Sequence, residues 1–201
     1  MAKIAADVVL LPSQEVTNQA IEANKGLLKQ YADQIILDKE NCLPHISLAM
    51  GCINERDITN IEKILKTIAG KYNPGQLSII GINTGTNSLG EKVSAFEVKK
   101  TGRLLSLHRE VMRRLKPYFS YDVTAEMVLS PPVAGESTLR WIRNYPEKSA
   151  FDSFFPHITI GYGQMDDCSF TAEFTASKLA LCHLGNHCTC RKVLAVAELK
   201  C

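Results

Sequence analysis

Two short segments of the chain have almost the same sequence, and each contains a histidine. They are Pro-His-Ile-Ser at residues 44–47 and Pro-His-Ile-Thr at residues 156–159. In a β-strand, alternate side chains share a face, so each segment would present its imidazole and hydroxyl together and bury its isoleucine. A lone histidine is more often a packing residue, but two matching tetrads in a chain with five histidines favour a paired functional role.

The chemistry that fits this pair is in-line displacement at phosphorus. A neutral imidazole can take a proton from the attacking water or hydroxyl, and an imidazolium can give one to the leaving oxygen. Hydroxyl groups can hydrogen-bond the non-bridging oxygens, where charge builds in the transition state. The sequence therefore predicts His45 and His157 as catalytic residues and Ser47 and Thr159 as phosphate-binding residues, with neither a metal nor a cofactor.

The segments around the two tetrads indicate a duplicated α+β unit. Each half has a strand, then a helix, then a strand that begins with the histidine segment. Val9 lies 36 positions before His45, whereas Glu97 lies 60 positions before His157, so the second half is about 24 residues longer. We expect a single bilobal domain over residues 1–201, with an insertion at about 120–150 that is mostly loop with one or two helical turns.

Hydrophobic periodicity and turn residues predict the other elements. Helices are expected after Ser13, from Asn54 to about Gly70, and from Thr101 to about Leu115, with His108 as a buried core residue. Strands are expected at 5–11, 34–37, 44–50, 77–82, 93–98 and 156–162. A closing hairpin of strands at about 175–184 and 188–199 is expected to turn at Gly185-Asn186.

Residues 45–48 and 157–160 resemble the paired His-x-Ser/Thr-hydrophobic motifs of the 2H phosphoesterase superfamily. The resemblance is to its LigT-like branch, which includes proteins called 2′–5′ RNA ligases and RNA 2′,3′-cyclic phosphodiesterases, and it covers most of the chain. It implies a bilobal α+β fold in which two antiparallel-type sheets line a central cleft with helices outside. It also implies metal-free catalysis by the two histidines and phosphate contacts from the serine and threonine.

The function that this resemblance implies is hydrolysis of a 2′,3′-cyclic phosphate, with an RNA 3′ end or a nucleotide as the partner. The reverse reaction, 2′–5′ ligation, would use the same groups. Within the same class, the substrate could instead be an ADP-ribose cyclic phosphate or a 2′–5′ oligonucleotide. A different class is a non-catalytic protein that binds nucleotides or RNA ends, although such a protein has no need of two proton carriers.

The insertion contains further candidates for substrate contacts. LigT-like proteins tend to carry an arginine shortly after the second motif, where this chain has Gly161-Tyr162-Gly163. Arginine and aromatic side chains in the insertion could supply that charge and stack on a base, if residues 136–154 form a flap beside the histidines. The expected contacts are Arg140, Trp141, Arg143, Tyr145 and Tyr162. Alternatively, Trp141 only packs the insertion onto the domain.

Charge and cysteine content set the remaining expectations. The formal net charge of +2 does not indicate a protein that coats nucleic acid duplexes. No apolar run is long enough to span a membrane, and the N-terminus lacks a signal-peptide pattern. Together with the odd number of cysteines, seven, these features favour a cytoplasmic protein with reduced thiols. We also expect a monomer. Three cysteines and two histidines in residues 182–190 leave a zinc-stabilised interaction protein as a further alternative.

Overall fold

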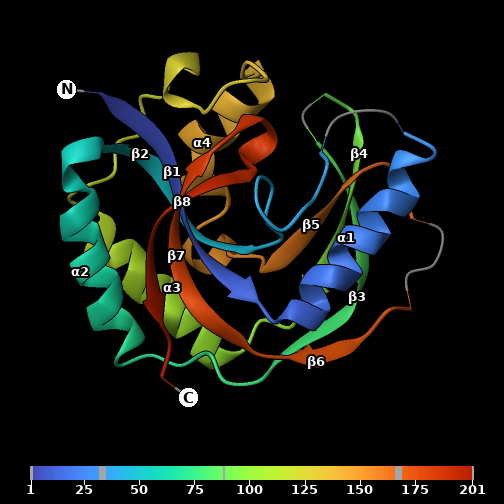
Figure 1. The fold of residues 1–201 in the computed structure, drawn as a ribbon, viewed down its shortest axis with the longest axis horizontal. Coiled ribbons are helices and arrows are strands. Elements are labelled where there is room, and N and C mark those ends of the chain that lie inside the picture. Colours follow the sequence, from blue (N-terminus) through green and yellow to red (C-terminus); the bar gives the residue numbers. More distant parts are fainter. Residues whose placement is uncertain (1, 32–34, 88, 166–168, 201) are drawn as a thin grey trace.

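The computed structural model describes residues 2–31, 35–87, 89–165 and 169–200, and its strands form two antiparallel sheets (Figure 1). The first sheet has the order β2-β1-β7-β8 and consists of Lys3–Pro12 (β1), Ile46–Asn54 (β2), Ala176–Leu184 (β7) and Cys190–Glu198 (β8). The second has the order β5-β4-β3-β6 and consists of Leu77–Thr86 (β3), Lys92–Val98 (β4), His157–Tyr162 (β5) and Ala172–Phe174 (β6). The two strands that begin within the histidine segments, β2 and β5, are therefore both edge strands.

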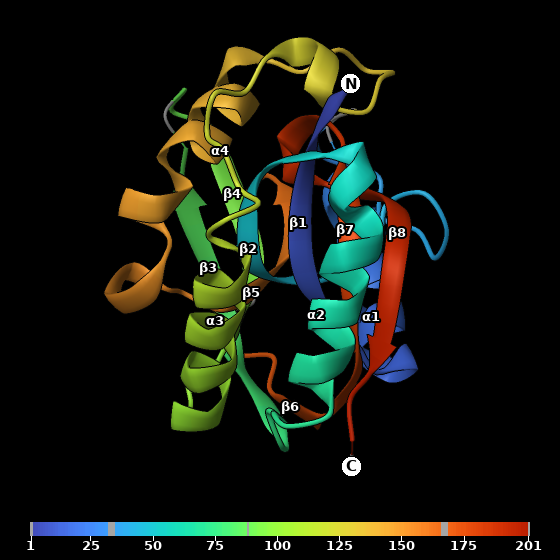
Figure 2. The same ribbon diagram turned by 90° about the vertical axis from the view of Figure 1, so that its left-hand side faces the viewer.

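The α-helices in the described ranges are Gln14–Leu28 (α1), Ile58–Ala69 (α2), Gly102–Leu115 (α3) and Glu136–Lys148 (α4). Two of them cross between the sheets. Helix α1 follows β1 of the first sheet but packs on β5 of the second, and α3 follows β4 of the second sheet but packs on β2 of the first. Helix α2 packs on β8 and lies beside α3 (Figure 2). The two sheets are thus tied together by helices from opposite halves.

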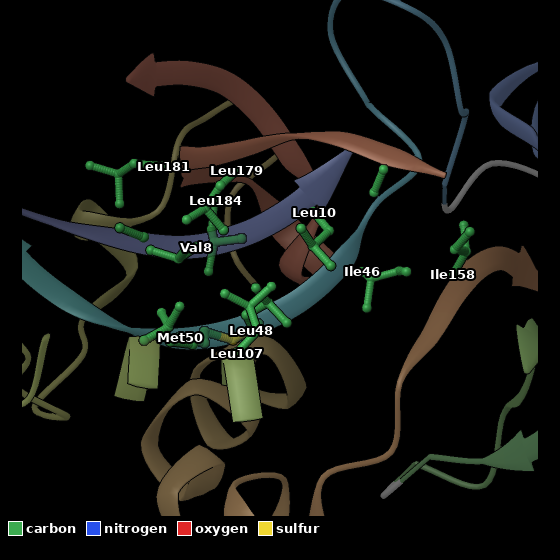
Figure 3. Close-up of a cluster of buried hydrophobic side chains, with 14 of the residues drawn as sticks. Val8, Leu10, Ile46, Leu48, Met50, Leu107, Ile158, Leu179, Leu181 and Leu184 are labelled. Carbon is green, nitrogen blue, oxygen red and sulfur yellow. The ribbon is translucent and has the colours of Figure 1, made fainter. Parts of the chain in front are cut away.

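The third helix shows why the predicted elements form. The side chain of Thr101 caps it by accepting a hydrogen bond from the Leu104 amide at 3.2 Å. Its apolar residues recur every three or four positions and are buried against the sheet. Figure 3 shows part of this core, with Leu107 of α3 below Leu48 and Met50 of β2. The predicted start, stripe and end of this helix are confirmed, and so is the buried position of His108.

The prediction that residues 120–150 are mostly loop is wrong, because they contain α4. The start of this helix is held by Asn186, whose Oδ1 accepts hydrogen bonds from the Gly135 amide at 3.0 Å and from the Thr138 hydroxyl at 2.7 Å. A partner so distant in the chain leaves no local capping signal. Pro146 lies in the last turn, and the helix ends two residues after it, as expected for a residue that cannot donate a backbone hydrogen bond.

The strand predicted at 34–37 is also wrong. Gln34 lies outside the described residues, and Ile35 to Leu37 adopt no regular structure. Their backbone groups bond instead to the side chain of Asn24, which donates to the Ile35 carbonyl at 2.9 Å and accepts from the Leu37 amide at 2.9 Å. The Asn24 side chain therefore supplies the hydrogen bonds that a neighbouring strand would supply to a β-strand.

The closing hairpin is confirmed, but its turn is longer than predicted. The connection runs from Gly185 to Thr189, and the register pairs Leu184 with Cys190. The first helix begins directly after Ser13, as predicted, although the Ser13 side chain makes no capping hydrogen bond. None of the helices in the described ranges is long and apolar enough to cross a membrane.

Candidate active site

The two histidine segments show the alternation of burial that the sequence predicts. Ile46 and Ile158 are 0 % exposed and belong to the main core. The imidazoles and hydroxyls lie on the opposite face and are partly exposed: His45 and Ser47 in the first half, His157 and Thr159 in the second. Burial of the isoleucines therefore holds each imidazole and its neighbouring hydroxyl on the same side of the strand.

Both imidazole rings are held in the same way. Nδ1 of His45 lies 2.7 Å from the carbonyl oxygen of Leu43, and Nδ1 of His157 lies 2.8 Å from that of Phe155. A carbonyl oxygen only accepts, so Nδ1 carries the proton in both rings. Nε2 is then the nitrogen that can take up or release a proton, which is the arrangement that general acid–base chemistry requires.

The two strands also share a β-bulge one residue beyond the hydroxyl. In the first sheet Val8 pairs with Ala49 and Val9 with Ser47, so Leu48 is the extra residue. In the second sheet Ser94 pairs with Gly161 and Ala95 with Thr159, which leaves Ile160 as the extra residue. Bulges change the direction of a strand and often lie beside functional sites. Because the bulges lie at equivalent positions, the two half-sites, His45 with Ser47 and His157 with Thr159, have the same local geometry.

The surroundings of both motif histidines lower the pKa of the imidazole. The pKa of His45 is lowered to about 4, chiefly by burial, while its hydrogen bond to Leu43 opposes the shift and the charge of His157 adds to it. Burial also lowers the pKa of His157, against the effect of its hydrogen bond to Phe155. The charge of His157 thus reaches His45, and burial favours the neutral form of each ring.

A buried carboxyl that the sequence analysis overlooked lies near Ser47 of the first motif. Asp7 is on β1 and is 0 % exposed, and within the described residues neither of its oxygens has a hydrogen-bond partner. Burial raises its pKa to about 8, although the Ser47 side chain and the Ala49 backbone lie near enough to oppose the shift. Asp7 sits in an apolar run of β-strand, so its sequence alone gave no indication of this position.

Tyr162, a predicted substrate contact, is in a hydrogen-bonded group at the end of β5. Its hydroxyl lies 2.9 Å from Nδ1 of His187, and the Asn186 side chain lies 3.0 Å from Nε2 of the same ring. His187 comes from the turn of the closing hairpin, so this group joins the two sheets. Part of the candidate zinc cluster is thereby engaged in hydrogen bonds.

Three more members of that cluster are engaged, while Cys188 is a free cysteine. Cys182 and Cys190 form a disulfide, so the expectation of reduced thiols is wrong for this pair. Nε2 of His183 bonds to the Met127 carbonyl at 3.0 Å. Within the described ranges, no three His, Cys, Asp or Glu side chains are grouped so that they could hold a metal ion. Cys168 and Cys201 lie outside these ranges.

The four candidate contacts in the insertion lie on α4 in different environments. Tyr145 is only 3 % exposed, so its ring is not available for stacking on a base. Trp141 is 50 % exposed, and Arg140 is also exposed. Arg143 forms an ion pair with Glu136 on the same helix at 3.5 Å. Helix α4 packs on β2 and on the turn that contains His187.

A cavity of about 380 Å³ lies next to the first histidine segment. Its lining includes Leu43 and Pro44, which lead directly into His45, and two lysines, Lys39 and Lys178. A second cavity of about 410 Å³ is lined by residues of the 125–133 segment and by His183. Neither cavity is lined by His45 or His157, so the first is a neighbour of the histidine pair rather than its container.

Comparisons with known proteins agree on the fold. No family model matches the sequence, and no curated protein matches it. Among solved structures, TT0787 of Thermus thermophilus has a TM-score of 0.63 with 17 % identity over 98 % of both chains. LigT of E. coli in its apo form has a TM-score of 0.53 with 13 % identity over the whole of both chains. A protein described as a phosphoesterase has a TM-score of 0.55 with 13 % identity, again over the whole of both chains.

These likenesses extend from end to end, and they confirm the α+β fold with two antiparallel sheets that the motifs predicted. Identities this low establish the architecture alone. The chain therefore has the fold of the LigT-like 2H phosphoesterases.

Proposed function

We propose that this protein is a metal-independent phosphodiesterase that hydrolyses a 2′,3′-cyclic phosphate on an RNA 3′ end or a nucleotide. The observation that carries the proposal is the matching pair of hydrogen bonds from Nδ1 of His45 and His157 to the carbonyl two residues before each. This arrangement leaves Nε2 of both rings available to take up or release a proton, as a reaction that uses both histidines at one phosphorus requires. A protein that only binds a phosphate has no use for it.

The reaction then needs one neutral and one protonated imidazole. The neutral ring removes a proton from water as the water oxygen bonds to phosphorus. The protonated ring delivers a proton to the ribose oxygen as its bond to phosphorus breaks, which leaves a phosphate monoester and a free hydroxyl. The Ser47 and Thr159 hydroxyls donate hydrogen bonds to the non-bridging oxygens. With the 5′-hydroxyl of another nucleotide in place of water, the same groups would form a 2′–5′ bond as the bond from phosphorus to the 3′ oxygen breaks and that oxygen takes up the proton.

Two observations support a nucleotide substrate. One structure of the same fold, with a TM-score of 0.51 and 12 % identity over the whole of both chains, is E. coli LigT complexed with 3′-AMP. In this chain, the cavity beside the first histidine segment is lined by Lys39 and Lys178. Two lysines suit the phosphates of a nucleotide or an RNA end, because they attract anions without needing a fixed geometry.

The test is a substrate panel with the histidine variants. The panel contains 2′,3′-cyclic nucleotides, RNA with a cyclic end, ADP-ribose cyclic phosphate and 2′–5′ dinucleotides. We expect turnover of the 2′,3′-cyclic phosphates, and a loss of about 10²- to 10⁴-fold in kcat for His45→Ala and for His157→Ala. Each variant should keep the circular dichroism spectrum of the parent protein.

Two controls separate the alternatives. Turnover should be unchanged by exhaustive chelation, because neither proton transfer nor phosphate binding uses a metal in this mechanism. Tight binding of the same compounds without turnover would instead identify a non-catalytic binding protein. Turnover of only the ADP-ribose or 2′–5′ compounds would retain the chemistry and change the substrate. Wild-type activity in either histidine variant would remove that residue from the mechanism.

A further inference from the structure

The two helices that cross between the sheets each carry one buried polar side chain at a matching place. Asn24 of α1 is 1 % exposed, and His108 of α3 is 0 % exposed. Burying a polar group is unfavourable unless its hydrogen bonds are made, so both positions require specific partners. Neither residue belongs to the histidine motifs, and neither is part of the proposed chemistry.

The partners of both side chains are the bulges beyond the histidine motifs. Nδ1 of His108 lies 2.7 Å from the carbonyl oxygen of Leu48, the extra residue of the bulge in β2. Nδ2 of Asn24 lies 2.8 Å from the carbonyl oxygen of Ile160, the extra residue of the bulge in β5. The extra residue of a bulge lacks a partner on the neighbouring strand, so a side chain from a helix takes that place.

Each side chain also bonds to the segment that leads into the other motif. Asn24 donates to the Ile35 carbonyl and accepts from the Leu37 amide, in the segment that approaches His45. Nε2 of His108 accepts a hydrogen bond from the Phe151 amide at 2.7 Å, in the segment that approaches His157.

The hydrogen bonds match the two side chains closely. Asn24 uses both amide hydrogens and its oxygen, and His108 donates from one ring nitrogen and accepts at the other, which only a neutral imidazole can do. The approach to β5 is also close. A Cβ atom added at Gly161 would lie 2.9 Å from Nδ2 of Asn24, so the residue after the bulge has no room for a side chain.

We propose that Asn24 and His108 are paired positioning residues that fix the distance between His45 and His157, because each joins the bulge beyond one motif to the segment that leads into the other. This role deepens the proposed function and rests on it only in assuming that the two histidines act together. Without the Asn24 or His108 bonds, helix packing alone would hold the half-sites at their relative positions. A displacement of about 1 Å between reacting groups can cost about 100-fold in rate.

The experiment compares Asn24→Leu and His108→Phe with a matched control. Phenylalanine keeps the stacking of ring 108 on Phe154, whose centroids are 4.0 Å apart, but makes neither hydrogen bond. The control is Leu104→Ala, which truncates a fully buried side chain on α3, the helix that carries His108. It should lower the thermal midpoint at least as much as either positioning variant does. We expect kcat to fall about 10- to 100-fold in the two positioning variants with KM within about threefold, and to stay unchanged in the control.

A second measurement does not depend on activity. NMR titration of the imidazole resonances should show the pKa of His45 moving up toward its ordinary value in Asn24→Leu and His108→Phe, because the charge of His157 becomes more distant. The pKa of His45 should be unchanged in Leu104→Ala. His108→Asn, which can keep a donor at the position of Nδ1, should restore part of the kcat that His108→Phe loses.

The outcomes distinguish the two proposals. If the pKa of His45 moves in both positioning variants while the parent protein turns over no substrate, the positioning role stands and the proposed function fails. If the pKa of His45 stays constant and kcat follows only the thermal midpoint across all the variants, Asn24 and His108 are ordinary core residues and the positioning role is overturned.

Discussion

Both motif histidines lie in surroundings that disfavour their charged form, yet the proposed reaction needs one of them charged. Burial lowers the pKa of both residues, and the pKa of His45 is lowered to about 4. The state in which one ring is protonated and the other is neutral is therefore most populated at a pH below the ordinary histidine pKa of about 6.5. A bound phosphate anion would favour that proton, so substrate binding and protonation support each other.

This predicts a pH profile displaced toward acid. A plot of kcat/KM against pH reports the groups of the free enzyme, so it should be bell-shaped with its alkaline limb below about pH 6.5. Above that limb, kcat/KM should fall about tenfold for each pH unit as the remaining proton is lost. The measurement is a set of initial rates between pH 4 and 9 at constant ionic strength. A flat profile from pH 6 to 8 contradicts the prediction.

Asp7 gives a second prediction at this scale. Its pKa of about 8 in the folded protein is above the usual carboxyl value, so the folded state holds a proton that the unfolded state releases. The stabilisation from this group is complete below the unfolded pKa and is lost as the pH rises through about 8. Asp7→Asn should therefore raise the free energy of unfolding at pH 8 by a few kcal/mol, and by much less at pH 4.5.

The check is urea unfolding of both proteins at pH 4.5 and pH 8. Groups other than Asp7 contribute equally to the two proteins, so the difference between them isolates this carboxyl. An equal difference at both pH values would show that Asp7 is ionised in the folded protein.

The motif residues were predictable because their signal is local. The sequence predicted which side chains of each tetrad are buried, since period-two alternation fixes the two faces of a strand. Asp7 and Asn24 were not predictable as parts of the site, because their roles depend on partners from other strands and segments. Asn24 in particular lies on α1, yet it bonds to Ile160 of the opposite sheet. No pattern in the sequence connects these two positions.

At the scale of elements, α4 is the main difference from the sequence prediction, and it changes how the insertion should be viewed. Helix α4 buries Tyr145 and packs on β2, so this part of the insertion is a regular element packed on the first sheet. Its exposed residues, Arg140 and Trp141, remain candidates for substrate contact. Arg143 is a weaker candidate, because its ion pair with Glu136 already occupies its guanidinium.

We therefore expect Trp141→Ala to raise KM for RNA with a cyclic end by about 5- to 150-fold, since stacking of a base on an aromatic ring contributes about 1–3 kcal/mol. Arg140→Ala should also raise this KM, because it removes a positive charge that attracts the phosphates. KM for a cyclic mononucleotide should change less, because it offers fewer bases and phosphates. Arg143→Ala is the matched comparison on the same helix. Thermal midpoints near that of the parent would show that the effect is on binding. A large loss of stability in Trp141→Ala with unchanged KM would make α4 purely structural.

At the scale of the whole molecule, the first and last strands lie in the same sheet. Strand β1 pairs with both β2 and β7, and β8 completes the sheet. The duplicated pattern in the sequence suggested two halves side by side, and the end-to-end likeness to solved structures confirms the fold. The sequence could not show that the helices exchange places, because helix periodicity identifies an apolar face and not the sheet that it covers.

We predict that the molecule unfolds in one transition. Helices α1 and α3 each depend on a sheet from the other half, so neither half can lose its structure without exposing apolar surface of the other. Fluorescence of Trp141, the single tryptophan, and circular dichroism of the whole chain should give the same midpoint in urea. Two separate midpoints would mean that the sheets unfold independently.

The exchange of α1 and α3 has a consequence for how such a chain can be built. A polypeptide with only one strand–helix–strand unit would leave its histidine strand without the helix that packs on it and its own helix without a surface to cover. Two such polypeptides would satisfy each other by trading helices, which is the arrangement of a domain-swapped dimer. This protein has the same arrangement within one chain. Its two histidines thus occupy the positions that symmetry would give a single residue in two subunits, and the covalent link between the halves leaves each free to diverge.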